Sequence, residues 1–246
     1  MPNPRSTALT KKGDTVMPNT KNKPAAPSVK KVPFAVSEAY KSIRTNLISK
    51  LLKEQKKVIA ISSPNASEGK STTAINIAIS LSQLGKKVLL VDTDAHRPSI
   101  AAKLNIKSEN GIMDVMAGLC EANQAIISYN SLLDIITIGH IPQNPTELFA
   151  SAGFEECIKE FAEKYDFVII DTPPVNVLSD ALVIAQKCDG LVLVVRSGMT
   201  KHSDLKRTLS GTGMLDINII GIILNGTGGE KKRYYKDYYN KSYNYK

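Results

Sequence analysis

Residues 58–72 read VIAISSPNASEGKST, an apolar run that passes into a polar loop and then into the start of a helix. Val58–Ser62 predicts a buried strand, and Ser71–Leu84 predicts a helix that stops before Gly85. The loop between them matches the second half of the phosphate-binding pattern G-x-x-x-x-G-K-[ST], with Pro64 in the place of the first glycine. Because N–H groups at a helix N-terminus attract phosphate, the segment predicts a nucleotide site. The alternative is a chance strand–loop–helix connection.

Each residue of this loop has an expected role in binding ATP and Mg²⁺. Gly69 lets the backbone approach the phosphates, and Lys70, a candidate catalytic residue, brings positive charge to the β- and γ-phosphates. Ser71 offers its hydroxyl to Mg²⁺, and Thr72 is a second phosphate contact. The nucleotide-binding residues expected in the loop are Ser67, Glu68, Gly69, Lys70, Ser71 and Thr72.

Further apolar runs alternate with helical patterns along the chain. The runs are continuous in Val, Ile and Leu, as expected when helices cover both faces of a parallel sheet. We expect strands at Val88–Asp92, Leu133–Ile138, Phe167–Asp171, Leu191–Val195 and Ile217–Leu224. We expect helices at 37–53, Thr146–Lys164, Ser179–Lys187 and Ser203–Met214. The pattern predicts one α/β domain of the P-loop NTPase class, with a mostly parallel sheet and helices on both faces.

The two ends of the chain differ from the middle in charge and composition. Residues 1–32 carry a net charge of +6 and residues 230–246 carry +4, whereas residues 33–229 sum to −1. We therefore expect a disordered basic tail at 1–32, the folded domain at 33–229, and a flexible tail at 230–246. That tail holds six of the nine tyrosines, which a folded core would not explain: Tyr234, Tyr235, Tyr238, Tyr239, Tyr243 and Tyr245. Two interpretations are open, a substrate segment whose tyrosines are modified and a segment that binds nucleic acid or lipid.

The cysteines and the hydropathy pattern bear on the compartment. Cys120, Cys157 and Cys188 are odd in number and form no C-x-x-C motif, which argues against a disulfide framework or a zinc site. No apolar run approaches the ~20 residues that span a bilayer. The N-terminus has no apolar segment typical of a secretory signal. We expect a cytoplasmic protein.

Two strand patterns end in aspartates. Asp92 and Asp94 follow one apolar run, and Asp171 ends another. Because the carboxyl ends of parallel strands line the ligand crevice, these side chains are candidates for catalysis and for holding Mg²⁺. We interpret Asp171 as the metal carboxylate, with Ser71 and Asp94 sharing the metal. A tyrosine hydroxyl titrates near pH 10 and needs a proton acceptor, a role we assign to Asp92. The roles of Asp92 and Asp94 can be exchanged, and Asp94 could instead cap the next helix.

Together these motifs resemble the bacterial tyrosine kinases, in particular the short cytoplasmic form that works with a separate membrane activator. The resemblance covers roughly residues 36–246. It is carried by EAYKSIR (38–44), SP (63–64) with EGKST (68–72), VDTD (91–94) with RP (97–98), IDTPP (170–174) with SDA (179–181), and NPTEL (144–148).

The resemblance implies an ATP- and Mg²⁺-dependent protein-tyrosine kinase that autophosphorylates its C-terminal tyrosines and regulates capsular or exopolysaccharide synthesis. It also implies a membrane-anchored activator that recruits the kinase to the inner face of the membrane, a homo-oligomer that can form a ring, and a cognate tyrosine phosphatase. No nucleic acid partner is expected. Asn225, in IILNG, is similar to the purine-contacting asparagine of related P-loop ATPases.

Two departures from the family and two rival functions are open at this point. The family's E-x-x-R-x-x-R helix, linked with ring assembly, has Lys41 at its second position, and lysine lacks the fork of arginine. His96 stands where the family has an arginine, whose task would pass to Arg97. One rival is a partition or division-site ATPase that switches dimerisation and binds DNA or membrane, although Asn65 stands where those proteins carry a signature lysine. The other is a nucleotide-dependent scaffold with little turnover.

Overall fold

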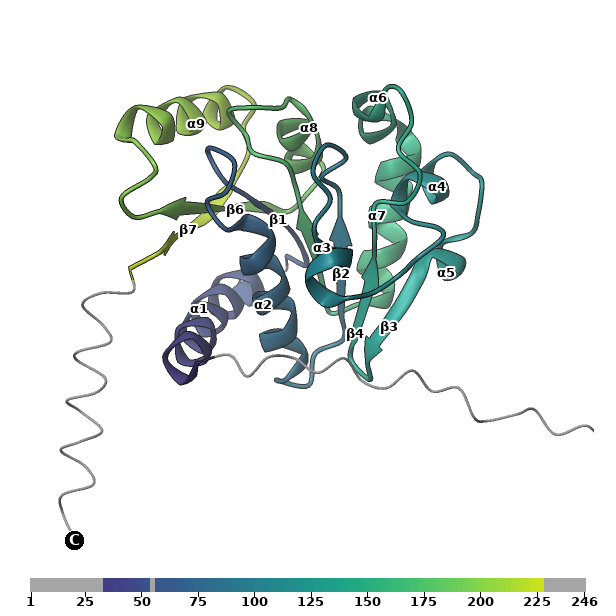
Figure 1. Ribbon diagram of the computed structural model, residues 1–246, viewed down its shortest axis with the longest axis horizontal. Helices are drawn as coiled ribbons and strands as arrows, with labels where there is room; N and C mark the ends of the chain where they lie inside the picture. The colour runs from purple at the N-terminus through teal and green to yellow at the C-terminus, as the bar shows by residue number, and fades with distance from the viewer. Residues whose placement is uncertain (1–32, 54–55, 228–246) are drawn as a thin grey trace, which may run out of the picture.

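A computed structural model describes residues 33–53 and 56–227 (Figure 1). The expectations for residues 1–32 and for the tyrosine-rich segment 230–246 lie outside the described residues. The helices are α1 (Phe34–Lys53), α2 (Lys70–Ser82), α3 (Ile100–Leu104), α4 (Ile112–Met116), α5 (Ala122–Ala125), α6 (Pro145–Ala150), α7 (Ala152–Lys164), α8 (Asp180–Gln186) and α9 (His202–Met214). The strands are β1 (Val58–Ser62), β2 (Val88–Asp92), β3 (Ile126–Asn130), β4 (Leu133–Ile136), β5 (Phe167–Asp171), β6 (Gly190–Arg196) and β7 (Ile219–Asn225).

Within the described residues, the strands form one 7-stranded sheet in the order β3-β4-β2-β5-β1-β6-β7. Every neighbouring pair is parallel except β3 and β4, which are antiparallel. Figure 1 shows helices on both sides of this sheet, with α1 and α2 next to each other. The predicted α/β domain with a mostly parallel sheet is confirmed.

The central strands contribute to cores on both faces of the sheet. Because successive residues of a strand point to opposite faces, Ile59 and Ile61 of β1 join the core under α1 and α2. Val58 and Ala60, from the same strand, join the cores on the other face. This double burial explains why the strands read as continuous apolar runs in the sequence.

The predicted single helix Thr146–Lys164 is wrong, because the chain breaks into α6 and α7. Ser151 has an extended backbone (φ −69°, ψ 161°) between the two helices. Its hydroxyl donates to the carbonyl of Leu148 at 2.6 Å. The break lets the buried rings of Phe149 and Phe154 pack edge to face, with centroids 5.3 Å apart and planes at 74°.

Several short elements between residues 100 and 130 were not predicted. The helices α3 and α4 have 5 residues each and α5 has 4, too few to show a helical period. The edge strand β3 has no fully buried residue, so it lacks the continuous apolar run of the central strands. Several predicted boundaries also shift; for example, β4 ends at Ile136, β7 begins at Ile219 and α2 ends at Ser82.

The helix α1 is fixed to α2 by burial and by one hydrogen bond. Leu51 is buried in the core that α1 shares with α2 and the sheet. The guanidinium of Arg44 donates to the carbonyl of Ser80 in α2 at 2.8 Å. The Glu38–Lys41 ion pair, 2.7 Å long, stays near the solvent. Arg44 is therefore engaged within its own chain.

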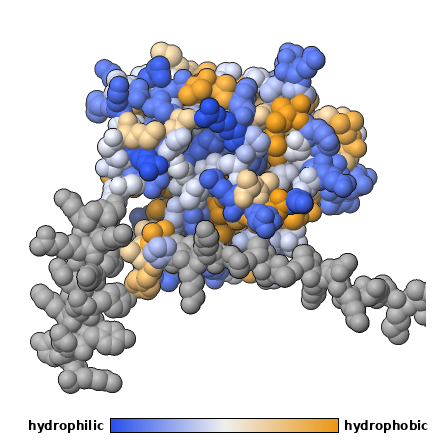
Figure 2. Space-filling model, viewed as in Figure 1, coloured by the Kyte–Doolittle hydropathy of each residue, from blue (hydrophilic) through white to orange (hydrophobic). Residues whose placement is uncertain are grey.

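The surface mixes polar and apolar residues. Figure 2 shows hydrophobic and hydrophilic residues interspersed over the face drawn. Exposed large apolar side chains such as Leu119, Val177 and Met214 come from different parts of the fold. No helix within the described ranges has both the length and the apolar character to cross a membrane.

Candidate active site

Three neighbouring strands deliver the predicted site residues to one edge of the sheet. β5 lies between β2 and β1. Asp171 at the end of β5 is the Cα partner of Asp92 at the end of β2, and it is also the partner of Ile61 near the end of β1. Because parallel strands end at the same edge, the loop after β1 meets both aspartates there. The structure thus brings the phosphate loop and the acidic strand ends together.

The phosphate loop, residues 63–69, passes through two left-handed residues before α2 begins. Ser67 has φ 64° and Gly69, the N-cap of α2, has φ 104°. A φ of 104° is strained for any L side chain, and a Cβ atom on Gly69 would also displace the side-chain amide of Asn225, so glycine is favoured there. The first helical hydrogen bond runs from the N–H of Thr73 to the carbonyl of Gly69. The N–H groups of the first turn before it therefore have no partner within the helix and can bind an anion.

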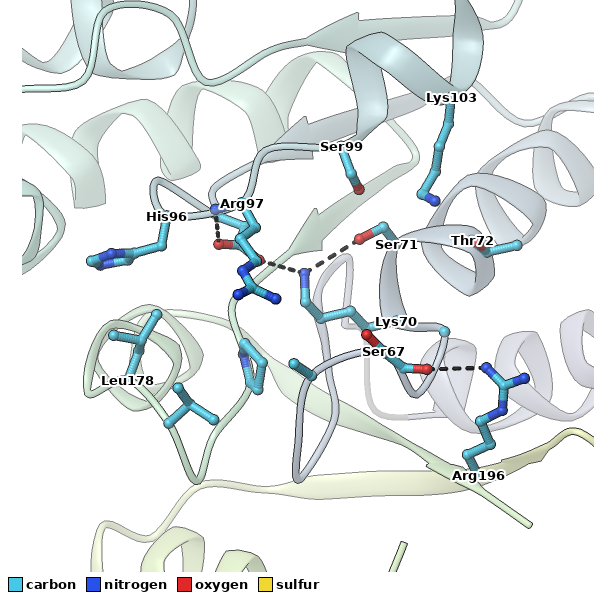
Figure 3. A pocket seen from close by; sticks show the side chains of 15 residues that line it. Ser67, Lys70, Ser71, Thr72, His96, Arg97, Ser99, Lys103, Leu178 and Arg196 are labelled. Atoms are coloured by element: carbon cyan, nitrogen blue, oxygen red, sulfur yellow. Dashed lines mark hydrogen bonds and ion pairs between the residues drawn. The ribbon is translucent and has the colours of Figure 1, made fainter. Parts of the chain in front are cut away.

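Lys70 lies between two carboxylates. Its Nζ is 2.7 Å from Oδ2 of Asp94 and 3.6 Å from Oδ1 of Asp171. It also donates to the hydroxyl of Ser71 at 3.3 Å (Figure 3). Burial by itself would lower the pKa of Lys70, but the charges of Asp171 and Asp94 outweigh it and raise the pKa above its ordinary value. The lysine is therefore positively charged at neutral pH.

The carboxylate of Asp171 is buried without a well-formed hydrogen bond. Neither of its oxygens has a partner at hydrogen-bond geometry among the described residues, and Asp171 is 0% exposed. Burial raises the pKa of Asp171 to about 7, opposed by the charge of Lys70 and by the neighbouring hydroxyl of Ser71. Unsatisfied oxygens at a strand end are what a divalent cation with oxygen ligands needs, so the residue fits a role in holding Mg²⁺.

A ready-made metal cage is not present in the part of the chain that the structure describes. No three His, Cys, Asp or Glu side chains there are arranged to hold a metal ion by themselves. This agrees with Mg²⁺ chemistry in phosphoryl-transfer sites, where one or two carboxylates and the substrate phosphates share the ion. Ser71 and Asp171 are the residues that fit this pattern best.

Asp92 is held by three backbone N–H groups. Its Oδ2 accepts the N–H groups of Ser99 and Ile100, each at 3.0 Å, and thereby caps α3. Its Oδ1 accepts the N–H of Asp94 at 3.2 Å. Burial raises the pKa of Asp92, while these three N–H groups oppose the rise. The helix-capping role considered for Asp94 therefore falls to Asp92, and Asp94 instead accepts the N–H of Arg97 at 2.9 Å.

A cavity of about 600 Å³ opens beside the phosphate loop, within the size range of small-molecule sites. Figure 3 shows the side chains of Arg97 and Lys70 among those that line it. Asp92 and Asp171 are not part of its lining. The predicted residues that line it are Ser67, Gly69, Lys70, Ser71, Thr72 and Asp94.

Sequence reasoning missed Ser99, which precedes α3, and four further lining residues, namely Lys103, Val177, Leu178 and Arg196. Arg196 ends β6 at the same edge of the sheet, which is a signal that could have found it. The other three match no motif. Lys103 belongs to the short helix α3, and the two apolar residues lie between β5 and α8.

Two predicted nucleotide-binding residues, Glu68 and Asn225, use their side chains to support the phosphate loop. Glu68 is 0% exposed, and its carboxylate accepts the N–H of Asn65 at 2.9 Å and the hydroxyl of Thr200 at 2.6 Å. The amide of Asn225 donates to the carbonyl of Glu68 at 2.9 Å. Neither side chain lines the cavity. No sequence motif pointed to Thr200.

Known proteins are similar to this chain in sequence and in fold. The AAA domain family matches residues 56–200. Tyrosine-protein kinase YwqD of Bacillus subtilis is 37% identical over 191 residues, which cover 77% of this chain and 81% of that protein. The kinase domain of the Escherichia coli tyrosine kinase ETK has a TM-score of 0.75 at 29% identity, covering 77% of this chain and 75% of that chain.

A division-site protein matches less well. The septum site-determining protein MinD from Pyrococcus horikoshii, complexed with Mg-ADP, has a TM-score of 0.60 at 26% identity, with coverages of 70% and 71%. The two kinases exceed it in identity, and ETK exceeds it in structural similarity. With the phosphate loop, the acidic strand ends and the matched length taken together, the chain belongs to the bacterial tyrosine-protein kinases.

Proposed function

We propose that this tyrosine kinase uses ATP and Mg²⁺ to phosphorylate the tyrosine cluster of its own C-terminal segment. The observation that carries the proposal is the position of Lys70, between Asp94 and Asp171 beside a cavity that fits a nucleotide. The acceptor is suggested by composition, since six tyrosines fall within residues 234–246, among Lys and Asn rather than aliphatic residues.

The phosphate end of the site supports the binding half of this proposal. The N–H groups at the start of α2 and the charge of Lys70 would hold the β- and γ-phosphates. Ser71 and Asp171 would hold Mg²⁺, which neutralises charge on the phosphate oxygens when it is bound. With phosphates present, Lys70 has a second set of partners and can leave Asp94. Positioning and electrostatics then supply most of the catalysis.

The geometry favours Asp94 over Asp92 as the base that receives the tyrosine proton. Both oxygens of Asp92 already accept backbone N–H groups, and Asp92 does not line the cavity. Asp94 lines the cavity, and its Oδ2 is paired with the ammonium group of Lys70. In the reaction the phenol oxygen attacks the γ-phosphorus, the bond to ADP breaks, and the phenol proton passes to the carboxylate.

The length and charge of the C-terminal segment suit transfer between neighbouring subunits of a homo-oligomer. A chain of about 20 residues reaches at most roughly 70 Å when extended. Residues 230–246 carry a charge of +4, and each phosphotyrosine adds about 1.5 to 2 negative charges. About three modifications would therefore reverse the sign of the segment. Such a reversal could release it from the site or from an acidic partner.

The remaining parts of the proposal rest on the family alone. They are a membrane-anchored activator that recruits the kinase to the inner face of the membrane, a cognate tyrosine phosphatase, assembly into a ring, and control of capsular or exopolysaccharide synthesis. For the ring, the pairing of Glu38 with Lys41 and of Arg44 with Ser80 means that those side chains would have to exchange partners on assembly.

One experiment tests the proposed function. The purified full chain is incubated with ATP and Mg²⁺, and modified side chains are mapped by mass spectrometry, beside a variant that ends at residue 229. We expect phosphate on several of the six tyrosines in the full chain and none in the shortened one. ATP hydrolysis without any phosphotyrosine would instead favour a partition-type or division-site ATPase. Nucleotide binding without turnover would favour a scaffold.

A further inference from the structure

We propose that Thr200 is a positioning residue of the nucleotide site. Its hydroxyl, acting through the buried carboxylate of Glu68, holds the phosphate loop in the conformation that receives the phosphates. The inference deepens the proposed function and rests on it, because it concerns how the same site binds ATP. Its basis is a set of contacts made by Glu68, Thr200 and Asn225, whose side chains do not line the cavity.

Glu68 is an unexpected side chain to find beside an anion site. It is 0% exposed, and hydroxyl and amide donors hold its carboxylate rather than a Lys or Arg of the described residues. A buried carboxylate is costly, and its negative charge repels a phosphate nearby. Direct contact with the nucleotide therefore does not explain the residue. Its hydrogen bonds must offset that cost, and they indicate its role.

Those hydrogen bonds join the loop to itself and to Thr200. One carboxylate oxygen, Oε2, accepts the N–H of Asn65 at 2.9 Å, which closes the loop across three residues. The other, Oε1, accepts the hydroxyl of Thr200 at 2.6 Å. Its contact with the side-chain amide of Asn65 is weak at 3.5 Å. The Thr200 hydroxyl is thus the main support of that oxygen.

Thr200 is itself held in a closed turn after β6. Its hydroxyl accepts the N–H of Arg196 at 2.7 Å, and its own N–H donates to the carbonyl of Arg196 at 2.9 Å. Because the hydroxyl accepts from the backbone, its single proton is directed to Glu68. The turn therefore presents a fixed donor to the loop, as pre-organised binding requires.

Two further hydrogen bonds join the loop to the ends of β6 and β7. The guanidinium of Arg196 donates to the carbonyl of Ser67 at 3.0 Å, as Figure 3 shows. The amide of Asn225, at the end of β7, donates to the carbonyl of Glu68. Arg196 and Asn225 bond to backbone carbonyls of the loop. Thr200 instead bonds to the side-chain carboxylate of Glu68, which also accepts the N–H of Asn65.

Removing the hydroxyl should therefore loosen the loop without filling or emptying the cavity. Hydrogen bonds to charged groups are among the stronger ones, so we expect about 10- to 100-fold weaker binding of ATP–Mg²⁺. The N–H groups that bind phosphate would lose their alignment before the nucleotide binds. The expected effect on the kinase reaction is a raised KM for ATP, with kcat changed by only about threefold.

The test compares three substitutions in the full chain. Thr200→Val removes the hydroxyl and keeps the shape, and Thr200→Ser keeps the hydroxyl. Thr212→Val is the matched control, because Thr212 is buried and its hydroxyl bonds to the carbonyls of Thr208 and Leu209 within α9. Calorimetry measures the affinity of each variant for ATP–Mg²⁺. We expect the affinity to fall in Thr200→Val and to stay close to that of the wild type in Thr200→Ser and Thr212→Val.

Two results would overturn the proposal. One is wild-type affinity in Thr200→Val, and the other is an equal loss in Thr212→Val, which would mark a general effect of core destabilisation. A double variant with Glu68→Gln adds a further check, because a hydroxyl that acts through the carboxylate adds little once the carboxylate is gone. If Thr200→Val does not fold, the affinity of the single variant Glu68→Gln for ATP–Mg²⁺ tests the proposal. An affinity equal to or tighter than that of the wild type would then reject it.

The affinity measurement does not depend on phosphoryl transfer. If the chain binds ATP–Mg²⁺ but no tyrosine is modified, the proposed function fails while the role of Thr200 is still measured. If tyrosines are modified normally and Thr200→Val keeps its affinity, the role of Thr200 fails alone. The two failures are therefore distinguishable.

Discussion

The ends of β2 and β5 carry the same short pattern, an apolar strand followed by Asp-Thr, yet the two aspartates have opposite surroundings. Asp92 accepts three backbone N–H groups and caps α3. The carboxylate of Asp171, whose Cα is the partner of Asp92 on the neighbouring strand, accepts none from the residues that the structure describes. The difference teaches that the pattern only delivers a carboxylate to the edge of the sheet. The hydrogen bonds around it decide whether the carboxylate supports structure or stays available for a ligand.

The threonines of the two patterns do share one role. The hydroxyl of Thr93 donates to the carbonyl of Asp171 at 2.7 Å, and the hydroxyl of Thr172 donates to the carbonyl of Ile61 at 3.2 Å. Each therefore fastens its strand end to the neighbouring one. The backbone of Asp171 is fixed by these bonds, while its carboxylate has no hydrogen-bond partner within residues 33–53 and 56–227.

The largest effect is expected from Lys70, which forms an ion pair with Asp171. Lys70 lies 3.6 Å from Asp171. We expect Lys70→Met to reduce tail phosphorylation by about 100- to 1,000-fold or more, because a positioned charge on the phosphates is lost. Phosphotyrosine is measured by mass spectrometry in the purified protein. Lys159→Met is the control, since Lys159 forms a surface ion pair with Glu155 on α7. Unchanged phosphotyrosine in Lys70→Met would reject the assignment.

Substituting each aspartate by asparagine tests the comparison directly. Asp92→Asn should lower the free energy of unfolding by about 1–3 kcal/mol, because an amide replaces an acceptor of N–H groups. Asp171→Asn should leave it unchanged or raise it, because a buried charge without hydrogen bonds is removed. Urea unfolding without nucleotide measures both. Equal losses in the two variants would show that the hydrogen-bond difference does not separate their roles.

The free energy of unfolding should depend on pH through the protonation of Asp171. Its pKa rises from 3.8 to about 7 in the folded chain, so the folded state binds the extra proton between those values. The contribution of this group is complete below about pH 4 and is lost as the pH rises towards 7. The free energy of unfolding of the wild type, relative to Asp171→Asn, should therefore fall over that range. A difference that is constant with pH would contradict the raised pKa.

A smaller effect is expected from His96, which follows the β2 end. Its Nε2 lies 3.4 Å from Oδ2 of Asp180, a buried oxygen without a hydrogen-bond partner among the described residues. Arginine is always charged and presents a fork of donors. We expect His96→Arg to raise the free energy of unfolding by up to about 1 kcal/mol at neutral pH, measured by thermal or urea unfolding. A decrease would mean that the longer side chain does not reach Asp180.

Much of the fold and part of the site could be predicted from the sequence. The continuous apolar runs predict the parallel sheet and the meeting of three strand ends at one edge. The loop before Lys70 predicts the start of α2. These features depend on local patterns and on the rule that parallel strands end together. For that reason the sequence by itself predicts that Asp92, Asp94 and Asp171 lie close to one another.

The rest depends on contacts between distant segments. The capping role of Asp92 requires α3, whose 5 residues show no helical period. The break at Ser151 falls inside a helical pattern, where two buried rings pack against each other. Thr200 lies 132 positions from Glu68 in a turn that matches no motif. Local sequence patterns do not predict hydrogen bonds between side chains that are far apart in the sequence.

The ion pair of Lys70 with Asp94 also has a consequence for the order of arrival at the site. Without nucleotide, the ammonium group already supplies the positive charge that the acidic strand ends attract. Free Mg²⁺ must compete with a tethered cation, whereas Mg²⁺ that arrives already chelated by ATP brings phosphates for the lysine to contact. The metal and the nucleotide should therefore enter as one complex, and calorimetric titration with MgCl₂ alone should give little heat.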